Sequence, residues 1–152
     1  MPSLPLPIAV FDGTIPAAIG DMESLVTFKA SNNNRRNSDG LTGNLPESLG
    51  LLEELYEFDV SDNSIEGEIP ASLGDCVSLG ILLLQQNALE GNVPAELGNL
   101  GSIQTMNLQE NDLEGEVPEG LCSDDAAQEI RVDCSVECTC CTEYDCRRRL
   151  DN

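Results

Sequence analysis

The residues best suited to chemistry in this chain are its cysteines. The sequence of 152 residues has seven, and six of them crowd the C-terminal end. An even cluster of this density is typical of a disulfide framework, which cross-links a region too small to have a large core of its own. The cysteines that we expect to form disulfides are Cys122, Cys134, Cys138, Cys140, Cys141 and Cys146.

A zinc site with four thiolate ligands is the alternative use of this cluster. The spacing CxxxCxCCxxxxC lacks the paired CxxC units of familiar zinc sites, so we favour disulfides and assign no metal. The seventh cysteine, Cys76, stands far from the cluster, and we expect it to be a free thiol buried among apolar residues. Because disulfides persist in oxidising compartments, the cluster predicts an extracellular or cell-surface location.

The composition gives little support for a catalytic site. Histidine, the commonest general base, is absent, and we find no phosphate-binding glycine loop and no kinase signature. The 28 acidic and seven basic residues give a formal net charge of −21, which repels nucleic acids and anionic membranes. We therefore predict no enzyme, no cofactor and no nucleic-acid partner. No apolar run approaches the length of a transmembrane helix.

These side chains are carried by a repeat of 24 residues that starts at Gly43, Gly67 and Gly91. The segment from Gly13 follows the same template with six extra residues, and Gly115 starts it again. Position 4 of the repeat is proline in all five segments. Positions 16 and 18 are apolar with one residue between them, which is typical of a short strand with one buried face. Because no single repeat buries its own apolar edge, the pattern predicts a stacked solenoid.

Two columns of the repeat define its interior. Position 16 should form one buried column, and position 21 should form a column of buried asparagines that donate to backbone carbonyls where the chain leaves each strand. The apolar column is Phe28, Phe58, Leu82, Met106 and Ile130, and the asparagine column is Asn33, Asn63, Asn87 and Asn111.

The repeat resembles the plant-type leucine-rich repeat, LxxLxxLxLxxNxLxGxIPxxLGxL, over about residues 4–134. The run DCSVECTCCTEYDC resembles the cysteine caps of leucine-rich-repeat proteins from diatoms and related algae. This resemblance implies an α/β-type solenoid, a leucine-rich-repeat horseshoe segment whose parallel sheet lines the concave face.

The chain divides into four parts on this basis. Residues 1–12 are the tail of a truncated repeat, since Leu4 and Leu6 fall on the strand positions and Phe11 on a later apolar position. The repeats occupy 13–121 with an insertion around 32–40, the cysteine-rich cap 122–146 and a basic tail 147–152. We expect Cys122 to pair with Cys134, because these two flank one degenerate repeat, and we expect Cys140 and Cys141 to take different partners. The truncated repeat predicts a fragment of a longer protein, whose other part has room for a signal or a membrane anchor.

Positions 15 and 17 flank the buried column and should face outward on the concave side. Two of these residues, Ile81 and Leu83, are apolar where their neighbours are polar, which marks a contact point. The candidate binding residues are Lys29, Glu57, Asp59, Ile81, Leu83, Thr105, Asn107, Glu129 and Arg131. A second candidate is the insertion, where Arg35 and Arg36 form a basic loop on an acidic body.

The resemblance implies a non-catalytic recognition module that binds a protein, peptide or glycan, within a secreted or membrane-anchored receptor-like protein. The acidic face favours a partner that is basic at its rim. A secreted inhibitor of cell-wall-degrading enzymes is an alternative. An ice-binding surface protein is another, although its flat, regular column of Thr or Asn is missing from the mixed outward positions.

Overall fold

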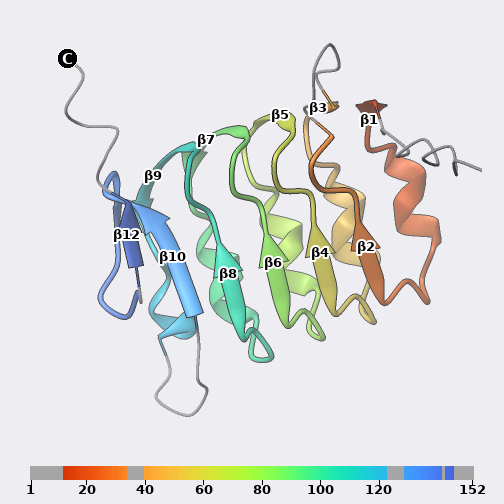
Figure 1. Cartoon of the computed structure of the whole chain (residues 1–152). Coiled ribbons are helices and arrows are strands. Elements are labelled where there is room, and N and C mark those ends of the chain that lie inside the picture. Colours follow the sequence, from red (N-terminus) through yellow and green to blue (C-terminus); the bar gives the residue numbers. More distant parts are fainter. Residues whose placement is uncertain (1–11, 34–39, 123–128, 142, 146–152) are drawn as a thin grey trace, which may run out of the picture.

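A computed structural model describes residues 12–33, 40–122, 129–141 and 143–145, the last three by their backbone. In this part of the chain the repeats stack side by side as one curved solenoid (Figure 1). Its first sheet is parallel throughout and has the order β12-β10-β8-β6-β4-β2. The strands are β2 (Thr27–Lys29), β4 (Glu57–Asp59), β6 (Ile81–Leu83), β8 (Thr105–Asn107), β10 (Glu129–Asp133) and β12 (Glu143–Asp145).

A second parallel sheet runs along another side of the solenoid, in the order β1-β3-β5-β7-β9-β11. Along the chain a short 3-10 helix follows each of the strands β1, β3, β5, β7 and β9, and these helices lie behind the first sheet in the view of Figure 1. The strands are β1 (Gly13–Thr14), β3 (Leu41–Gly43), β5 (Ser64–Gly67), β7 (Ala88–Asn92), β9 (Asp112–Glu116) and β11 (Val136–Glu137). The helices are η1 (Ala17–Asp21), η2 (Glu47–Leu51), η3 (Ala71–Asp75), η4 (Ala95–Asn99) and η5 (Glu119–Leu121). The helices in the described residues are too short and too polar to span a membrane.

The register of the first sheet follows the repeat. Each strand pairs residue for residue with the same position of its neighbour, so Phe58 lies between Phe28 and Leu82. Phe58, Leu82, Met106 and Ile130 are buried, whereas the residues on either side of each are partly exposed. The prediction that position 16 forms the core column is therefore confirmed. Phe28 is only partly buried, because it lies in the last described strand of the sheet.

Proline and glycine shape the opposite side of each coil. A proline in extended conformation precedes each 3-10 helix, as Pro70 does before η3, and has no N–H that would be left unbonded at a helix start. A glycine inside each of the first four helices lets neighbouring coils approach. At Gly74 a Cβ atom would lie 2.2 Å from the backbone oxygen of Glu96, so any side chain there would separate the two coils.

Asn33, Asn63 and Asn111 of the asparagine column are buried as expected, Asn87 is partly buried, and the side-chain amides donate to backbone carbonyls. The Asn87 Nδ2 group donates to the backbone oxygens of Val60 and Leu84 at 3.0 and 3.1 Å, and its Oδ1 accepts from the Ile65 N–H at 3.0 Å. Asn63 and Asn111 repeat this arrangement one coil away on either side. Each asparagine thus links its own coil to the coil before it.

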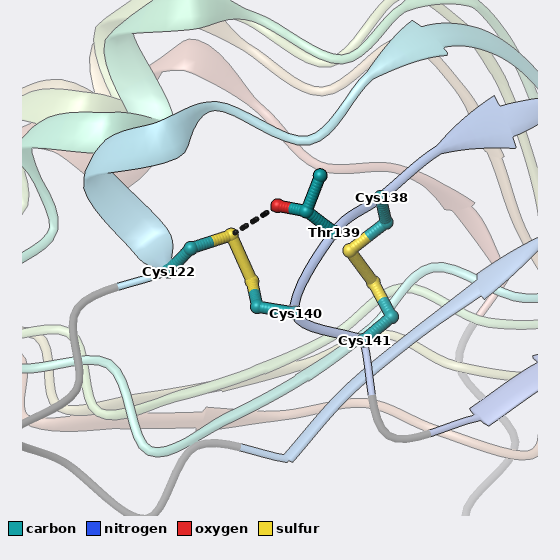
Figure 2. Close-up of a disulfide and its surroundings, with 5 residues drawn as sticks. All are labelled: Cys122, Cys138, Thr139, Cys140 and Cys141. Carbon is teal, nitrogen blue, oxygen red and sulfur yellow. Dashed lines mark hydrogen bonds between the residues drawn. A yellow bond between two sulfur atoms is a disulfide. The ribbon is translucent and has the colours of Figure 1, made fainter.

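The C-terminal cap is cross-linked by disulfides, as the cysteine cluster predicted. Cys122 bonds to Cys140, and Cys138 bonds to Cys141 (Figure 2). The expected pair of Cys122 with Cys134 is therefore wrong, although Cys134 is also disulfide-bonded. The reason is that Cys134 directly follows β10 in the sheet, whereas Cys122 follows η5 on the far side of the coil. Cys140 and Cys141 do take different partners, and Cys146 lies outside the described residues.

Cys76 is the free cysteine of the described residues, and its side chain is fully buried at the end of η3. The thiol donates to the backbone oxygen of Leu49 in the preceding coil at 3.1 Å. Burial raises the pKa of this thiol to about 11, and the charge of Asp75 adds to the effect. The prediction of a free, buried thiol is confirmed.

Candidate binding face

The candidate site is the outward surface of strands β2, β4, β6, β8 and β10. Side chains alternate along each strand, so the positions before and after the buried column share this surface. The structure brings all nine residues that the sequence singled out onto it, in adjacent strands with aligned register. They are Lys29, Glu57, Asp59, Ile81, Leu83, Thr105, Asn107, Glu129 and Arg131.

The middle of this face is apolar. Ile81 and Leu83 are both partly exposed, on either side of the buried Leu82 in β6. The register places Ile81 between Glu57 and Thr105. Leu83 lies between Asp59 and Asn107 by the same register. The two aliphatic side chains therefore form a small apolar strip with polar residues on both sides.

Tyr56 makes a contact between coils next to this strip, and sequence reasoning missed it. Tyr56 directly precedes β4 and is 38% exposed. Its ring lies against Gly80, where a Cβ atom would come within 2.4 Å of the ring. The hydroxyl reaches one coil further and donates to Oε1 of Gln104 at 3.4 Å. The ring thus lies against Gly80, the residue that directly precedes Ile81 at the start of β6. The sequence does hold a signal for this contact. Position 14 of the repeat is Tyr56 in one repeat and Gly80, which has no side chain, in the next.

Charged pairs lie on the two flanks. Lys29 Nζ lies 2.7 Å from Glu57 Oε1 on the N-terminal side, and this hydrogen bond raises the pKa of Lys29 despite slight opposition from desolvation. Arg131 pairs with Glu129 on the C-terminal side. Asp59 accepts hydrogen bonds from the backbone N–H and hydroxyl of Ser61 at 3.1 and 2.7 Å. Asp59 lies between Lys29 and Leu83 in the register and forms no ion pair within 4.0 Å in the described part of the chain.

Gln85 lies on the same face, two residues beyond Leu83. Its side-chain oxygen Oε1 is buried and accepts no hydrogen bond from any described residue. An unpaired buried acceptor costs about 1–3 kcal/mol. Departures of this kind from good packing are concentrated at functional surfaces.

The basic loop offered as a second candidate site lies largely outside the described residues. Arg35 and Arg36 fall within residues 34–39, for which the structure gives no placement. The tails 1–11 and 146–152 are outside the described part as well.

The comparisons with known proteins agree with this geometry. The family model "Leucine Rich Repeat" matches residues 54–76 and 102–123. No curated protein matches the sequence significantly. Together with the stacked parallel strands, the family match shows that the chain carries leucine-rich repeats and folds as a leucine-rich-repeat solenoid.

The solved structures place these repeats in the plant type. The chain is similar to the ectodomain of the plant membrane receptor kinase GASSHO1/SCHENGEN3 from Arabidopsis thaliana, in complex with Casparian strip integrity factor 2. Identity is 26% and the TM-score is 0.71, over 88% of this chain and 17% of that one. It is also similar to the BIR2 ectodomain from Arabidopsis thaliana, with 32% identity and a TM-score of 0.64 over 74% of this chain and 56% of that one.

A plant ice-binding protein shares the fold. It is 24% identical with a TM-score of 0.65, over 85% of this chain and 42% of that one. This likeness shows the fold alone. The chain spans about a fifth of the length of three of the structures that it matches, GASSHO1/SCHENGEN3, the plant peptide hormone receptor RGFR1 and PEPR1.

Proposed function

We propose that the concave face binds an extended peptide or protein segment, without catalysis, through an apolar anchor formed by Ile81 and Leu83, with the exposed Tyr56 ring over the neighbouring Gly80. The observation that carries this proposal is the position of the anchor at the centre of a polar, acidic face. Binding sites commonly place aromatic and aliphatic anchors centrally and charged residues at the rim. Tyrosine suits this role because its ring offers a large contact area with few rotatable bonds.

The charges around the anchor favour a partner with basic residues. Lys29 and Arg131 each form an ion pair with a glutamate of the same face, and Asp59 lies between Lys29 and Leu83 without an ion pair of its own in the described residues. A lysine or arginine of the ligand that follows an apolar residue would lie within reach of Asp59. Such rim charges act mainly on the rate of association, because they attract the partner over distances comparable to the Debye length.

The receptor-like context is part of the same proposal. The receptor kinase GASSHO1/SCHENGEN3 was solved in complex with Casparian strip integrity factor 2, and this chain shares the fold of its ectodomain. The disulfides of the C-terminal cap support an extracellular or cell-surface location. We therefore favour a recognition segment of a secreted or membrane-anchored protein. An inhibitor of cell-wall-degrading enzymes would use the same face with an enzyme as its protein ligand.

Ice binding is less well supported by the surface. The outward column at position 15 consists of Thr27, Glu57, Ile81, Thr105 and Glu129. Ice binding requires a regular column of one small polar residue type, and carboxylates and isoleucine interrupt this one. A thermal-hysteresis measurement on the purified chain should therefore give no activity.

The binding proposal is tested with the double variant Ile81→Ser/Leu83→Ser. A displayed library of random peptides is selected on the wild-type protein, and one enriched peptide is titrated against both proteins. We expect the double variant to lose about 30-fold or more in affinity, corresponding to about 2 kcal/mol. Val77→Ser is the matched control, because Val77 is also apolar, 58% exposed and away from the sheet strands.

The variant should keep its fold, since both side chains face solvent in part. Thermal unfolding of the double variant within a few degrees of wild type checks this point. Equal peptide affinity for the wild type and the double variant would contradict the anchor and move the site elsewhere. Variants of Arg35 and Arg36 would then be examined with the same peptide.

A further inference from the structure

The ring of Tyr56 lies flat over the backbone of Gly80 in the next coil. A Cβ atom on Gly80 would come within 2.4, 2.9 and 3.0 Å of three adjacent ring carbons, Cε2, Cζ and Cδ2. The two longer distances are nearly equal and exceed the shortest by only 0.5 and 0.6 Å, which places this atom over the ring face and not beside the ring edge. Tyr56 is nevertheless 38% exposed, so its exposed area belongs to the opposite face and the edges of the ring.

Gly80 lacks a side chain for the sake of this ring and not of its own backbone. Position 14 of the repeat is Val26, Tyr56 and Gln104 in three other coils, so the backbone accepts a side chain there. The φ angle of Gly80 is not positive, so its conformation does not require glycine. Any side chain at this position would instead push the ring away. Gly80 is therefore a positioning residue for Tyr56.

Both ends of Tyr56 are held by hydrogen bonds to neighbouring coils. Its backbone N–H donates to the oxygen of Val26 at 2.8 Å, and its own oxygen accepts from Gly80 and Ile81 at 2.9 and 3.0 Å. The hydroxyl donates to Gln104 Oε1 at 3.4 Å. An aromatic group that is already fixed in one orientation loses little conformational entropy when a ligand binds. The outer face of the ring is thus a preorganised flat surface at the start of β6.

We propose that the outer face of Tyr56 stacks with the guanidinium group of an arginine in the bound partner, and that Gly80 sets this preference. The inference rests on the function proposed above, because it specifies one residue of the same partner. The face of a tyrosine ring attracts a cation. A guanidinium group is planar and weakly hydrated, so it stacks on such a face better than the compact ammonium group of lysine.

The charges around Tyr56 favour a cation over a neutral ring. Glu53 and Glu54 precede it by two and three residues, are exposed, and form no ion pair within 4.0 Å in the described part of the chain. Glu57 follows it and pairs with Lys29, the basic residue of the adjacent strand. The formal net charge of the whole chain is −21. This field attracts an arginine, whereas an aromatic side chain of the partner gains nothing from it.

The position of the ring is tested first, without a ligand. One Hα proton of Gly80 points in the direction of the absent Cβ and therefore lies under the ring face, where the ring current moves its NMR signal upfield. We expect this signal to return to the ordinary glycine range in Tyr56→Leu. It should not change in Tyr144→Phe, which replaces the second tyrosine of the chain. An ordinary Gly80 signal in the wild type would overturn the proposal.

The preference for arginine is tested with the peptide that the random library yields on the wild-type protein. We expect this peptide to contain an arginine whose replacement by lysine weakens binding to the wild type about threefold or more, as expected for the loss of a stacked cation. Gly80→Ala should bind the arginine and lysine peptides equally, because its ring no longer lies flat. Gly101→Ala is the matched control and should keep the wild-type preference, since a Cβ atom on this exposed glycine would meet nothing within 4 Å.

Two results would overturn this proposal while the proposed function stands. One is an enriched peptide without arginine, and the other is the same preference for arginine in the wild type and in Gly80→Ala. In both cases the peptide would still lose affinity for Ile81→Ser/Leu83→Ser. A peptide with unchanged affinity for that double variant would contradict the anchor and, with it, this inference.

Discussion

The two ends of the solenoid meet solvent in different ways. At the C-terminal end the last coil keeps β10 paired with β8, and the chain then turns into a cap that is fixed by disulfides. At the N-terminal end β2 and the hollow beside Phe28 are open in the described residues. The repeats between these ends are nearly alike. The difference between the two ends therefore shows which interactions close the end of a repeat stack.

At the C-terminal end, an acidic side chain takes the place of the backbone acceptors that the next coil provides elsewhere in the stack. In the interior, the N–H groups of Gln86 and Asn87 donate to backbone oxygens of the next coil, at Gln109 and Glu110. One coil later the equivalent N–H groups, of Glu110 and Asn111, donate to the two carboxylate oxygens of Asp133 at 3.0 and 3.1 Å. A single side chain therefore replaces two backbone acceptors as the chain leaves the repeat.

The largest expected effect compares two phenylalanines at the same repeat position. Phe28 and Phe58 are stacked, with ring centroids 5.4 Å apart, but only Phe58 is fully buried. Phe58→Ala should lower the free energy of unfolding by about 3–5 kcal/mol, because it leaves a cavity between two coils. Phe28→Ala should cost about half as much if its outer side is exposed. Urea unfolding of both variants measures the difference.

Equal costs for the two substitutions would contradict an open N-terminal end. They would instead indicate that the outer side of Phe28 is covered as completely as that of Phe58.

The next effect concerns the two disulfides of the cap. Cys122–Cys140 closes a loop with a sequence separation of 18, whereas Cys138–Cys141 closes one of three. In the chain-entropy description, removing the longer cross-link should cost about 3 kcal/mol and removing the shorter about 1.5 kcal/mol. The variants are Cys122→Ser/Cys140→Ser and Cys138→Ser/Cys141→Ser, compared by thermal and urea unfolding. A larger loss from the shorter loop would show that the cap is stabilised by local packing around Cys138 instead.

Much of the fold could be predicted because the repeat specifies it several times over. Five aligned segments fix which residues share the buried column, and the register of Phe58, Leu82 and Met106 follows directly. Cap pairing could not be predicted this way, because the cap occurs once and spacing does not fix which thiols meet. The Tyr56 contact was missed because it depends on a gap at Gly80 in the next coil. Alternation along one strand does not reveal a contact between coils.

The last and smallest effect uses Cys76, which lies midway between the two ends in a fully buried position. Burial raises the pKa of its thiol from 9.0 to about 11. The unfolded chain therefore loses this proton first as the pH rises, and the folded state loses stability between pH 9 and pH 11. We expect the free energy of unfolding of wild type to fall by about 1 kcal/mol more than that of Cys76→Ala between pH 8 and pH 10.

The two proteins are compared only by how steeply their free energies of unfolding change with pH, because Cys76→Ala also loses packing at every pH. All other titratable groups are the same in both proteins, so the difference between the two slopes belongs to the thiol. If the free energies of unfolding of the two proteins change equally with pH, solvent reaches Cys76 in the folded state. Local unfolding would then extend from one end of the solenoid as far as η3. Repeating the measurement in the Cys122→Ser/Cys140→Ser background would show whether the C-terminal end is the one that opens.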